Sequence, residues 1–420
     1  MELLGQRLYR FYQSCNLLYH HSLRGIAPSW IAEYLDFGKD PAIFSVARMN
    51  RFRHALPLVL RPDLILTEKG FLACELDSVP GGIGLMVQFQ EIYHRLAENH
   101  STIIGGKDGM LQAFARMIKE VGAGLKPVPT SHVAIVITEE AIDYRQEMEA
   151  LAIRLCQVGV PTSVVIPQDL EYRNDEVFYD YQRLDLLYRF FELYELPKMD
   201  RSDLLLKAIK KRKVKMTPPL QPHLEEKMWF AFFHHPALRS FWREQLGEET
   251  HHCLQKLFPR TWILDPRPIR PTGVVSGIEF RGNALQDWRI LSSATQKERS
   301  QWVIKPSGYS PLAWGARGVR VGEDLSGHDW KQSLEEALSS FTRGPWLLQE
   351  WGHPIRQSFQ SISLEGIEER KEVRARISPF YFVTDTEEKT KLSGVLATLC
   401  SLDKKILHGM PGAILAPAGC

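Results

Sequence analysis

The segment from His132 to Pro167 constrains the fold more than any other part of the chain. It contains a buried strand run, HVAIVIT, a helical segment, YRQEMEALAIRLCQVG, and a second strand run, PTSVVIP. Two strands joined through a helix pair in parallel, so this pattern predicts a β-α-β unit within a parallel sheet. The segment lacks the glycine fingerprint G-x-G-x-x-G and therefore does not indicate a dinucleotide.

The rest of the chain divides into helical and strand-rich parts. Apolar residues at helical spacing predict helices in LYRFYQSCNLLYHHSL, SWIAEYLDF, LMVQFQEIYHRLAEN, LQAFARMIKEVGAGL (closed by Gly122 and Gly124) and EEKMWFAFFHHPALRSFW. Strand signals dominate after residue 300, in WVIKPSG, GVRVG, WLLQEW, VRARISPFYFV and GVLATLC. The composition shift at KPVPTSH marks a boundary near residue 130. We expect a mixed α/β fold with a helical region and hairpin (1–130), a small Rossmann-like domain (131–215) and a third region (216–420).

Composition excludes several classes of function. The net charge is +2, from 52 basic and 50 acidic side chains, which indicates no field for a polyanion. We therefore expect no nucleic-acid partner, and KAIKKRKVKM (Lys207–Met216) is interpreted as a solvated linker. No stretch approaches eighteen apolar residues and the start does not resemble a signal peptide, so no membrane span is expected. Six scattered cysteines and three adjacent histidine pairs indicate neither a disulfide framework nor a metal site. A cytoplasmic location is expected.

The stretch LRPDLILTEKGFLACELDS reads as a β-hairpin. Its turn signal, EKG, is a three-residue loop with glycine at the left-handed position. Pairing about Lys69 places Asp63 opposite Glu75 and Arg61 opposite Asp77. Because side chains alternate between faces, these charged residues share one face. The other face is expected to be apolar, with Leu64, Leu66, Leu72, Cys74 and Leu76.

Two interpretations of the charged face remain open. Carboxylates directly across a strand pair repel each other by about 0.2–1 kcal/mol when exposed, and by more when desolvated. Mg²⁺ would relieve this repulsion, because it takes carboxylate oxygens and leaves positions for water and phosphate, while Arg61 offers a planar fork to a phosphate oxygen. A solvated hairpin face with Arg61 paired to Asp77 explains the same residues.

A second group of residues lies in WVIKPSGYSPLAWGARGVRVG, residues 302–322. Lys305 ends a strand run and glycines recur in the following loop, so backbone N–H groups and a lysine charge could approach phosphates. This is not a Walker loop, and a surface turn would explain it as well. Gln349 and Glu350 end the apolar strand PWLLQEW, which suits an adenine edge or an ordinary strand end.

In this order the segments resemble the ATP-grasp superfamily, specifically its circularly permuted branch, which includes the synthetase domain of glutathionylspermidine synthase. The branch pattern, Arg-x-Asp followed by Glu-x-Asn, is matched by R-P-D at 61–63 and E-L-D at 75–77. Asp77 departs from it, because asparagine is common there. The resemblance covers the hairpin and most of residues 224–420.

The resemblance implies a role for each matched residue. Arg61 would contact the transferring phosphate, and one or two Mg²⁺ ions would be held by Asp63, Glu75 and Asp77. ATP would lie under a glycine-rich lid loop in the third region. The residues implied in nucleotide binding are Lys227, Lys305, Ser307, Gly308, Gly315, Gly318, Gln349 and Glu350.

The implied activity is that of an ATP-dependent ligase, which joins a small-molecule carboxylate to an amine through an acylphosphate. A small-molecule kinase, or a protein that binds ATP without turnover, would use the same site. Arg374 and Arg376 share a strand face in VRARISPF and are candidates for binding the acylphosphate or a carboxylate, although a solvated face explains them equally well. Arg189 is a weaker candidate for binding substrate, and a structural role is favoured for it. His408 in LHGMPGAIL could line the site, although a glycine-rich connection is the simpler explanation.

Overall fold

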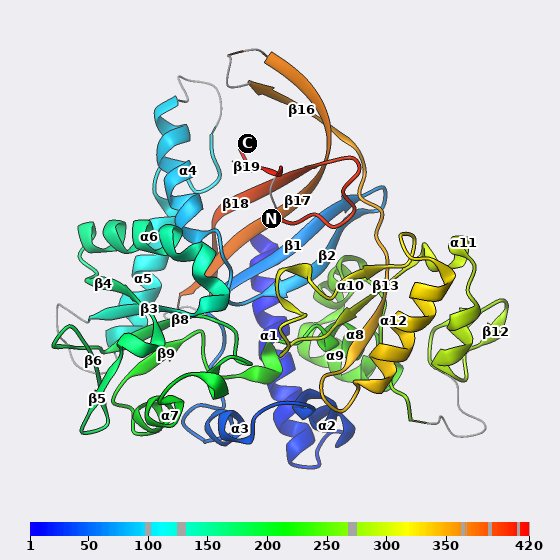
Figure 1. The fold of residues 1–420 in the computed structure, drawn as a ribbon, viewed down its shortest axis with the longest axis horizontal. Helices are drawn as coiled ribbons and strands as arrows, with labels where there is room; N and C mark the ends of the chain where they lie inside the picture. Colours follow the sequence, from blue (N-terminus) through cyan, green and yellow to red (C-terminus); the bar gives the residue numbers. More distant parts are fainter. Residues whose placement is uncertain are drawn as a thin grey trace.

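The computed structural model describes residues 1–96, 102–123, 132–267, 275–362, 366, 368–384, 389–409 and 412–419. Gly124, the expected boundary near residue 130 and Cys420 lie outside these ranges. Figure 1 shows a central twisted sheet between an α/β layer, in cyan to green, and a smaller unit of sheet and helices, in green to yellow. None of the described helices is long and apolar enough to cross a membrane.

The central sheet is antiparallel and joins the two ends of the sequence. Its order is β19-β18-β17-β1-β2, and β16 pairs with the first part of β17, Glu368 to Val373. In Figure 1 the blue hairpin lies beside the orange and red C-terminal strands. The hairpin turn has two residues instead of the expected three, because Thr67 pairs with Gly70. The strands are β1 (Val59–Thr67), β2 (Gly70–Asp77), β16 (Gln357–Ile362), β17 (Glu368–Thr384), β18 (Lys389–Ser401) and β19 (Ile414–Pro417).

Helices cover one face of the central sheet, as the apolar periodicity near the N-terminus predicts. Leu8, Phe11 and Leu18 lie on one side of α1 and share a buried cluster with Leu60 and Tyr381 of the sheet. The same cluster takes in residues of α8, α9 and α10, so the opposite face of the hairpin remains available for a cleft. These helices are α1 (Glu2–Leu23), α2 (Trp30–Asp36), α8 (Met228–His234), α9 (Arg239–Leu246) and α10 (Glu248–Leu257).

The β-α-β prediction is confirmed by a parallel four-stranded sheet of order β4-β3-β8-β9. Val133 and Ile135 of β3 pack under α4, α5 and α6, whereas Ala134 and Val136 face α3 and α7. Both faces are buried, which explains the uninterrupted apolar run. The elements are α3 (Pro41–Ala47), α4 (Ile83–Leu96), α5 (Gly109–Ala123), β3 (Val133–Ile137), α6 (Arg145–Gln157), β4 (Thr162–Val165), β8 (Leu186–Phe190), α7 (Ser202–Lys210) and β9 (Lys215–Thr217).

One expectation in this region is wrong. The segment Lys207–Met216 is not a solvated linker, because it ends α7 and begins β9, the last strand of the parallel sheet. Its cationic side chains lie on the outer surface, where Lys207 and Lys211 both pair with Asp175. Helix α5 is described as far as Ala123, between the two glycines expected to close it, and Gly124 lies outside the described residues.

The smaller unit is a four-stranded antiparallel sheet of order β10-β15-β13-β14. Helix α12 packs on it through Trp330, Leu334 and Leu338. Two small antiparallel groups, β5-β6-β7 and β11-β12, lie outside the three main sheets. The remaining elements are β5 (Glu171–Arg173), β6 (Glu176–Tyr179), β7 (Gln182–Arg183), β10 (Thr261–Ile263), β11 (Glu279–Phe280), β12 (Asn283–Ala284), α11 (Gln296–Arg299), β13 (Trp302–Pro306), β14 (Arg320–Val321), α12 (Gly327–Ser339) and β15 (Trp346–Glu350).

Candidate active site

The charged end of the hairpin has the register that the sequence predicts. Arg61 pairs with Asp77 and Asp63 pairs with Glu75 across β1 and β2. All four side chains line one cleft, with a volume of about 670 Å³. The cleft lies between the hairpin, the smaller unit and the parallel sheet with the helices that cover it, which we call the α/β domain. Cavities of 300–1,000 Å³ are typical of ligand sites.

A β-bulge beyond this charged end changes which side chains reach the cleft. The register shifts after Asp63, where β2 carries one extra residue, Cys74. Leu72 and Cys74 consequently lie with Ile65 on the cleft side, whereas Leu64 is in the core on the other face. The expected common apolar face is therefore wrong on the turn side of the bulge.

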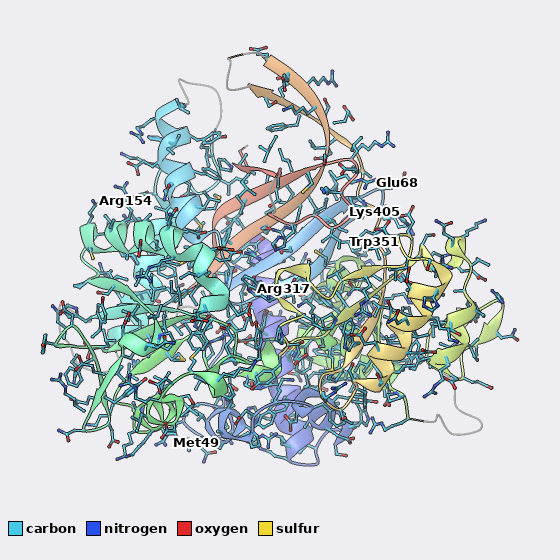
Figure 2. The ribbon with its side chains drawn as sticks, viewed as in Figure 1. Met49, Glu68, Arg154, Arg317, Trp351 and Lys405 are labelled. Carbon is cyan, nitrogen blue, oxygen red and sulfur yellow. The ribbon has the colours of Figure 1, made fainter. Side chains whose placement is uncertain are left out.

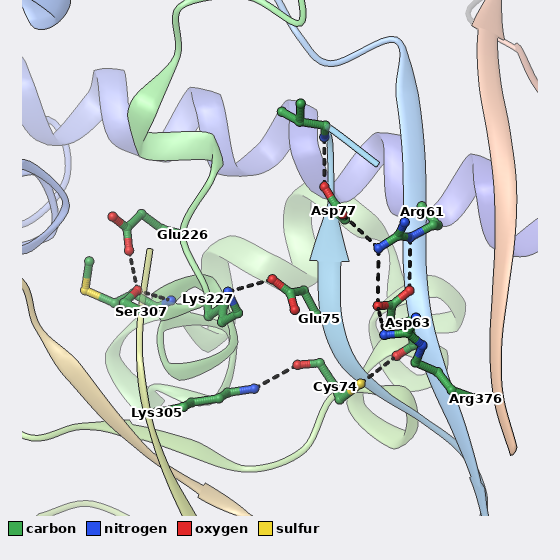
Figure 3. Close-up of polar contacts among 12 residues, drawn as sticks. Arg61, Asp63, Cys74, Glu75, Asp77, Glu226, Lys227, Lys305, Ser307 and Arg376 are labelled. Carbon is green, nitrogen blue, oxygen red and sulfur yellow. Dashed lines mark hydrogen bonds and ion pairs between the residues drawn. The ribbon is translucent and has the colours of Figure 1, made fainter. Parts of the chain in front are cut away.

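Arg61 is the centre of the charged face (Figure 3). Its Nε donates to Asp63 Oδ1 at 3.0 Å, and its two Nη atoms donate to Asp77 Oδ2 and to the Gly81 carbonyl, each at 2.8 Å. Burial disfavours the charged guanidinium, but Asp63 and then Asp77 outweigh it and raise the pKa of Arg61. The arginine therefore stays charged and ties both strands to the segment that leads into α4.

Asp63 is enclosed by hydrogen-bond donors. Arg376 Nη1 lies 3.0 Å from its Oδ2, and Ser378 Oγ donates to its Oδ1 at 2.8 Å. The side chain is 3% exposed. Burial alone would raise the pKa of Asp63, but Arg376 and then Arg61 lower it below its usual value. Asp63 is thus an ionised carboxylate that holds two arginines in place.

Glu75 and Asp77 are more accessible. Lys227 Nζ lies 2.6 Å from Glu75 Oε1, and Asp77 Oδ1 accepts the N–H of Val79 at 2.8 Å. Burial raises the pKa of Asp77 against the opposing effect of Arg61, with a further contribution from Glu75. Burial also opposes the charge of Lys227, but Glu75 outweighs it and raises the pKa of this lysine.

These contacts test whether the hairpin fits Mg²⁺. Within the described ranges, no group of three or more His, Cys, Asp or Glu side chains is arranged to hold a metal ion. Glu75 and Asp77 offer carboxylate oxygens on side chains that are 38% and 24% exposed, which fits a hard divalent cation. Asp63 fits less well as a direct ligand, because its oxygens are already shared among Arg61, Arg376 and Ser378.

Lys305 faces the hairpin from β13, across the cleft. Its Nζ donates to the Cys74 carbonyl at 2.8 Å, at the bulge, although the two residues are 231 positions apart (Figure 3). Burial, aided by the charge of Lys227, lowers the pKa of Lys305 to about 8. In the described part of the chain the Cys74 carbonyl is its one hydrogen-bond acceptor, which leaves two N–H donors for a ligand.

The start of the predicted lid loop is fixed against the turn that carries Lys227. The Lys227 N–H donates to the Ser307 carbonyl at 3.2 Å, and Ser307 Oγ donates to Glu226. A Cβ on Gly308 would come within 2.3 Å of the Glu225 carbonyl, so a larger residue does not fit. Lys39, in the N-terminal helical region, forms a fully buried ion pair with Glu226 and so anchors this turn.

The rest of the loop reaches the α/β domain. Arg317 Nη1 lies 2.8 Å from Glu140 Oε2, and the rings of Trp314 and Tyr144 meet edge to face at 6.3 Å. Gly318 passes so close to the preceding loop that a Cβ would come within 2.8 Å of the Leu312 carbonyl. The loop thus covers the cleft and contacts both of its walls.

Gln349 and Glu350, at the end of β15, line the same cleft. Gln349 Nε2 donates to Thr261 Oγ1 at 2.9 Å, and the side chain is buried. Glu350 lies 3.6 Å from Arg260, and burial raises its pKa. These contacts fix both side chains at the end of β15, where Gln349 pairs with Val303 and Glu350 pairs with Trp302 of β13.

The structure brings most of the predicted site residues together. Figure 2 labels Arg317, Trp351 and Lys405, which also line the cleft. Gly308 borders a smaller adjoining pocket, and Ser307 and Gly318 lie behind the lining. Arg374 is not part of the cleft, because its guanidinium donates to the Lys404 carbonyl at 3.1 Å. The predicted residues that line it are Arg61, Asp63, Glu75, Asp77, Lys227, Lys305, Gly315, Gln349, Glu350 and Arg376.

Several lining residues were missed by the sequence analysis. His408 lines the cleft, which was the less favoured of its two expected roles. Arg189 is fully buried and pairs with Glu225, in agreement with its expected structural role. Tyr144 and Glu192 follow the carboxyl ends of β3 and β8, where parallel sheets bind ligands, and this rule could have found them. Burial, with the nearby Glu225, raises the pKa of Glu192 to about 8.

Comparisons with known proteins show the fold. No protein-family model and no curated protein matches the chain. A glutathione synthetase-like effector from Globodera pallida is similar over 99% of this chain and 84% of its own, with a TM-score of 0.57 and 10% sequence identity. A candidate gamma-glutamylcysteine synthetase from Methylobacillus flagellatus aligns with 99% of this chain and 86% of its own, with a TM-score of 0.48 and 10% identity. The chain therefore has a mixed α/β fold shared with a glutathione synthetase-like protein.

Proposed function

We propose that the protein is an ATP- and Mg²⁺-dependent carboxylate-amine ligase with a circularly permuted ATP-grasp fold. The observation that carries this proposal is the contact between Lys305 and the Cys74 carbonyl. This contact joins the lysine to the acidic hairpin. The glycine loop after the lysine and the strand end with Gln349 and Glu350 line the same cleft. The substrates would be small molecules.

The sheet topology supports the permutation. The hairpin of residues 59–77 pairs with β17, so an N-terminal element completes a sheet whose other strands come from the C-terminal part of the chain. This is the arrangement expected when the acidic segment precedes the lysine and its loop in sequence.

Each residue at the ATP end has a chemical task that follows from its contacts. Lys305 and Lys227 supply positive charge for phosphate oxygens, and the glycine loop lets backbone N–H groups approach them. Arg61, held by Asp63 and Asp77, offers charge to the phosphoryl group in transfer. Mg²⁺, which Glu75 and Asp77 would hold, neutralises charge on phosphate oxygens when bound.

The proposed reaction has two steps. A substrate carboxylate oxygen attacks the γ-phosphorus of ATP, which gives an acylphosphate and ADP. An amine nitrogen then attacks the acyl carbon, the C–O bond to phosphate breaks, and an amide, inorganic phosphate and a proton are released. Arg376, which lines the cleft beside Asp63, would contact the acyl or phosphate oxygens.

Nucleotide binding and turnover test the proposal separately. Mg·ATP at about 100 times its Kd should stabilise the fold by about 2.7 kcal/mol, measured as a shift in thermal unfolding. ADP release should then require a carboxylic acid and an amine together, and the mass of the product should equal that of the amide. No shift with Mg·ATP would contradict nucleotide binding. ADP release with one phosphorylated substrate would indicate a kinase, and a shift without turnover would indicate a non-catalytic ATP-binding protein.

A further inference from the structure

The cleft has a second end whose chemistry differs from that of the ATP end. Its wall is formed by side chains that belong to, or pack against, the hydrophobic cluster between the α/β domain and the central sheet. They line the cleft from the segment between β2 and α4, from α4, from the short 3-10 helix Glu139–Tyr144 before α6, and from β8, β18 and β19. The wall consists of Val79, Leu85, Tyr144, Phe190, Leu396 and Leu415.

One carboxylate in this region lacks a partner. Glu192 borders both the main cleft and the smaller pocket beside it. Across the residues that the structure describes, its carboxylate makes no hydrogen bond or ion pair. The two cations whose charge reaches it are already engaged, Arg189 by Glu225 and Lys227 by Glu75.

A second carboxylate at this end, Glu147, forms no ion pair with any of the described residues. Glu147 lines the cleft and accepts the N–H of Gly84 at the start of α4, at 3.0 Å. The charge of Arg61 reaches Glu147, and the charges of Arg61 and Arg376 reach Tyr144, but both guanidiniums are already paired with the hairpin carboxylates. The end is therefore apolar with unneutralised acidic groups, which favours a cationic ligand over an anionic one.

We propose that this end of the cleft is the acceptor subsite, and that it takes a primary amine with an apolar body whose ammonium group meets Glu192. The position fits the general rule that open α/β sheets bind ligands at the carboxyl ends of their strands, because β3 and β8 end here and their following helices, α6 and α7, pack on opposite faces. A cationic ligand also favours the ionised form of a buried carboxyl. This inference rests on the proposed ligase function for the identity of its ligand as the acceptor.

Three probes that share a phenyl group and differ in charge test the subsite. Phenethylamine, 2-phenylethanol and 3-phenylpropionate are titrated into the full chain, with Mg²⁺ and a non-hydrolysable ATP analogue, and their Kd values are measured by saturation-transfer NMR. An ammonium-carboxylate contact should make phenethylamine bind at least about 10-fold more tightly than the alcohol. The anion should bind most weakly.

Two variants assign this preference to Glu192. Glu192→Gln should remove the difference between amine and alcohol, whereas Glu149→Gln, which removes an exposed carboxylate from α6, should retain it. Leu415→Ala should weaken the binding of the amine and of the alcohol by the same factor. Tightest binding of the anion, no binding of any probe, or an unchanged amine preference in Glu192→Gln would overturn the subsite. Nucleotide binding is measured in the same samples, so loss of Mg·ATP binding with a retained amine preference would contradict the ligase proposal alone.

Discussion

The two ends of the cleft are built from different parts of the chain and differ in charge. The end proposed to bind ATP is formed by β13, β15 and the glycine loop, and it presents Lys305, which keeps two donors unused among the described contacts. The other end is formed by the α/β domain and the outer strands of the central sheet, and it presents an apolar wall with Glu192. One end thus suits an anion and the other suits a cation, as a reaction between a phosphorylated carboxylate and an amine requires.

The hairpin lies between these ends and belongs to both. Arg61 and Asp63 connect it to Arg376 and to the start of α4, whereas Cys74 connects it to Lys305. Changes in the hairpin should therefore affect the whole cleft. Changes elsewhere should affect one end and spare the other.

The largest effect is expected for Asp63→Ala, because it leaves Arg61 and Arg376 buried without their shared carboxylate. Removing one partner of a buried ion pair costs about 3–5 kcal/mol, which urea unfolding would measure. The exposed Asp403→Ala should change stability by less than about 0.5 kcal/mol. Because the folded pKa of Asp63 is lowered, its contribution is present above the pKa of the unfolded carboxyl and is lost as the pH falls through the folded value. Equal stability of the two variants would contradict this role.

Lys305→Met should affect the ATP end alone. Loss of a charged hydrogen bond corresponds to about 1.5–3 kcal/mol, so the Kd of Mg·ATP should rise by about 10- to 150-fold. Isothermal titration would measure it, with the exposed Lys404→Met as the control. Phenethylamine binding should be unchanged, and a parallel loss of both ligands would mean that the two ends are not separate.

The pH dependence of ATP binding should report the same lysine. Its pKa of about 8 means that the Kd of ATP should rise as the pH increases through this value, whereas Lys305→Arg should flatten the profile. Between pH 8 and 10.5 the unfolded lysine holds a proton that the folded one has released, so the nucleotide-free protein should gain stability as the pH rises. A flat wild-type profile would show that Lys305 does not contact the phosphates.

Gly318→Ala tests the close packing of the lid loop. The new Cβ would meet the Leu312 carbonyl at 2.8 Å, which should destabilise this loop conformation by about 1–3 kcal/mol and weaken ATP binding accordingly. Gly344→Ala is the matched control, because a Cβ there meets nothing within 4 Å. Similar ATP affinities in both variants would argue that the loop does not cover the nucleotide.

The smallest effect is expected for the contact between the lid loop and the α/β domain. Arg317 and Glu140 are both largely exposed, so their interaction should contribute about 0.2–1 kcal/mol. A double-mutant cycle of Arg317→Ala and Glu140→Ala, read as the Kd of Mg·ATP, would measure it, and high salt should reduce the coupling. Zero coupling would mean that the contact between Arg317 and Glu140 contributes nothing to ATP binding.

The sequence predicted the charged end of the hairpin because its register depends on local alternation around a turn. It failed one step further along, since a single extra residue, Cys74, reverses the facing of Leu72. No local pattern predicts this bulge, whose Cys74 carbonyl accepts a hydrogen bond from Lys305 on a strand that is distant in sequence. The contacts of Arg61 and Asp63 with Arg376 were likewise beyond reach, because they depend on how β17 pairs with β1.

The β-α-β unit was predicted because buried parallel strands have an unmistakable apolar run, as in Val133–Ile137. Lys207–Met216 was misinterpreted because its charge was given more weight than the helical periodicity that buries Ala208 and Ile209. The acceptor end was missed altogether. Its residues come from elements that are far apart in sequence. Only the fold brings Glu192 and Leu415 to one cleft.

The pairing of β1 with β17 has a consequence for biosynthesis. β17 begins roughly 300 residues after β1 ends, and at about 5–20 residues per second a ribosome needs on the order of 15–60 s to make that length. During this interval the hairpin has an unpaired edge, Val59–Thr67, that can associate with other nascent chains. Chaperone dependence, and a preference for slow dilution in refolding, are therefore expected of a chain whose cleft closes only when its last strands emerge.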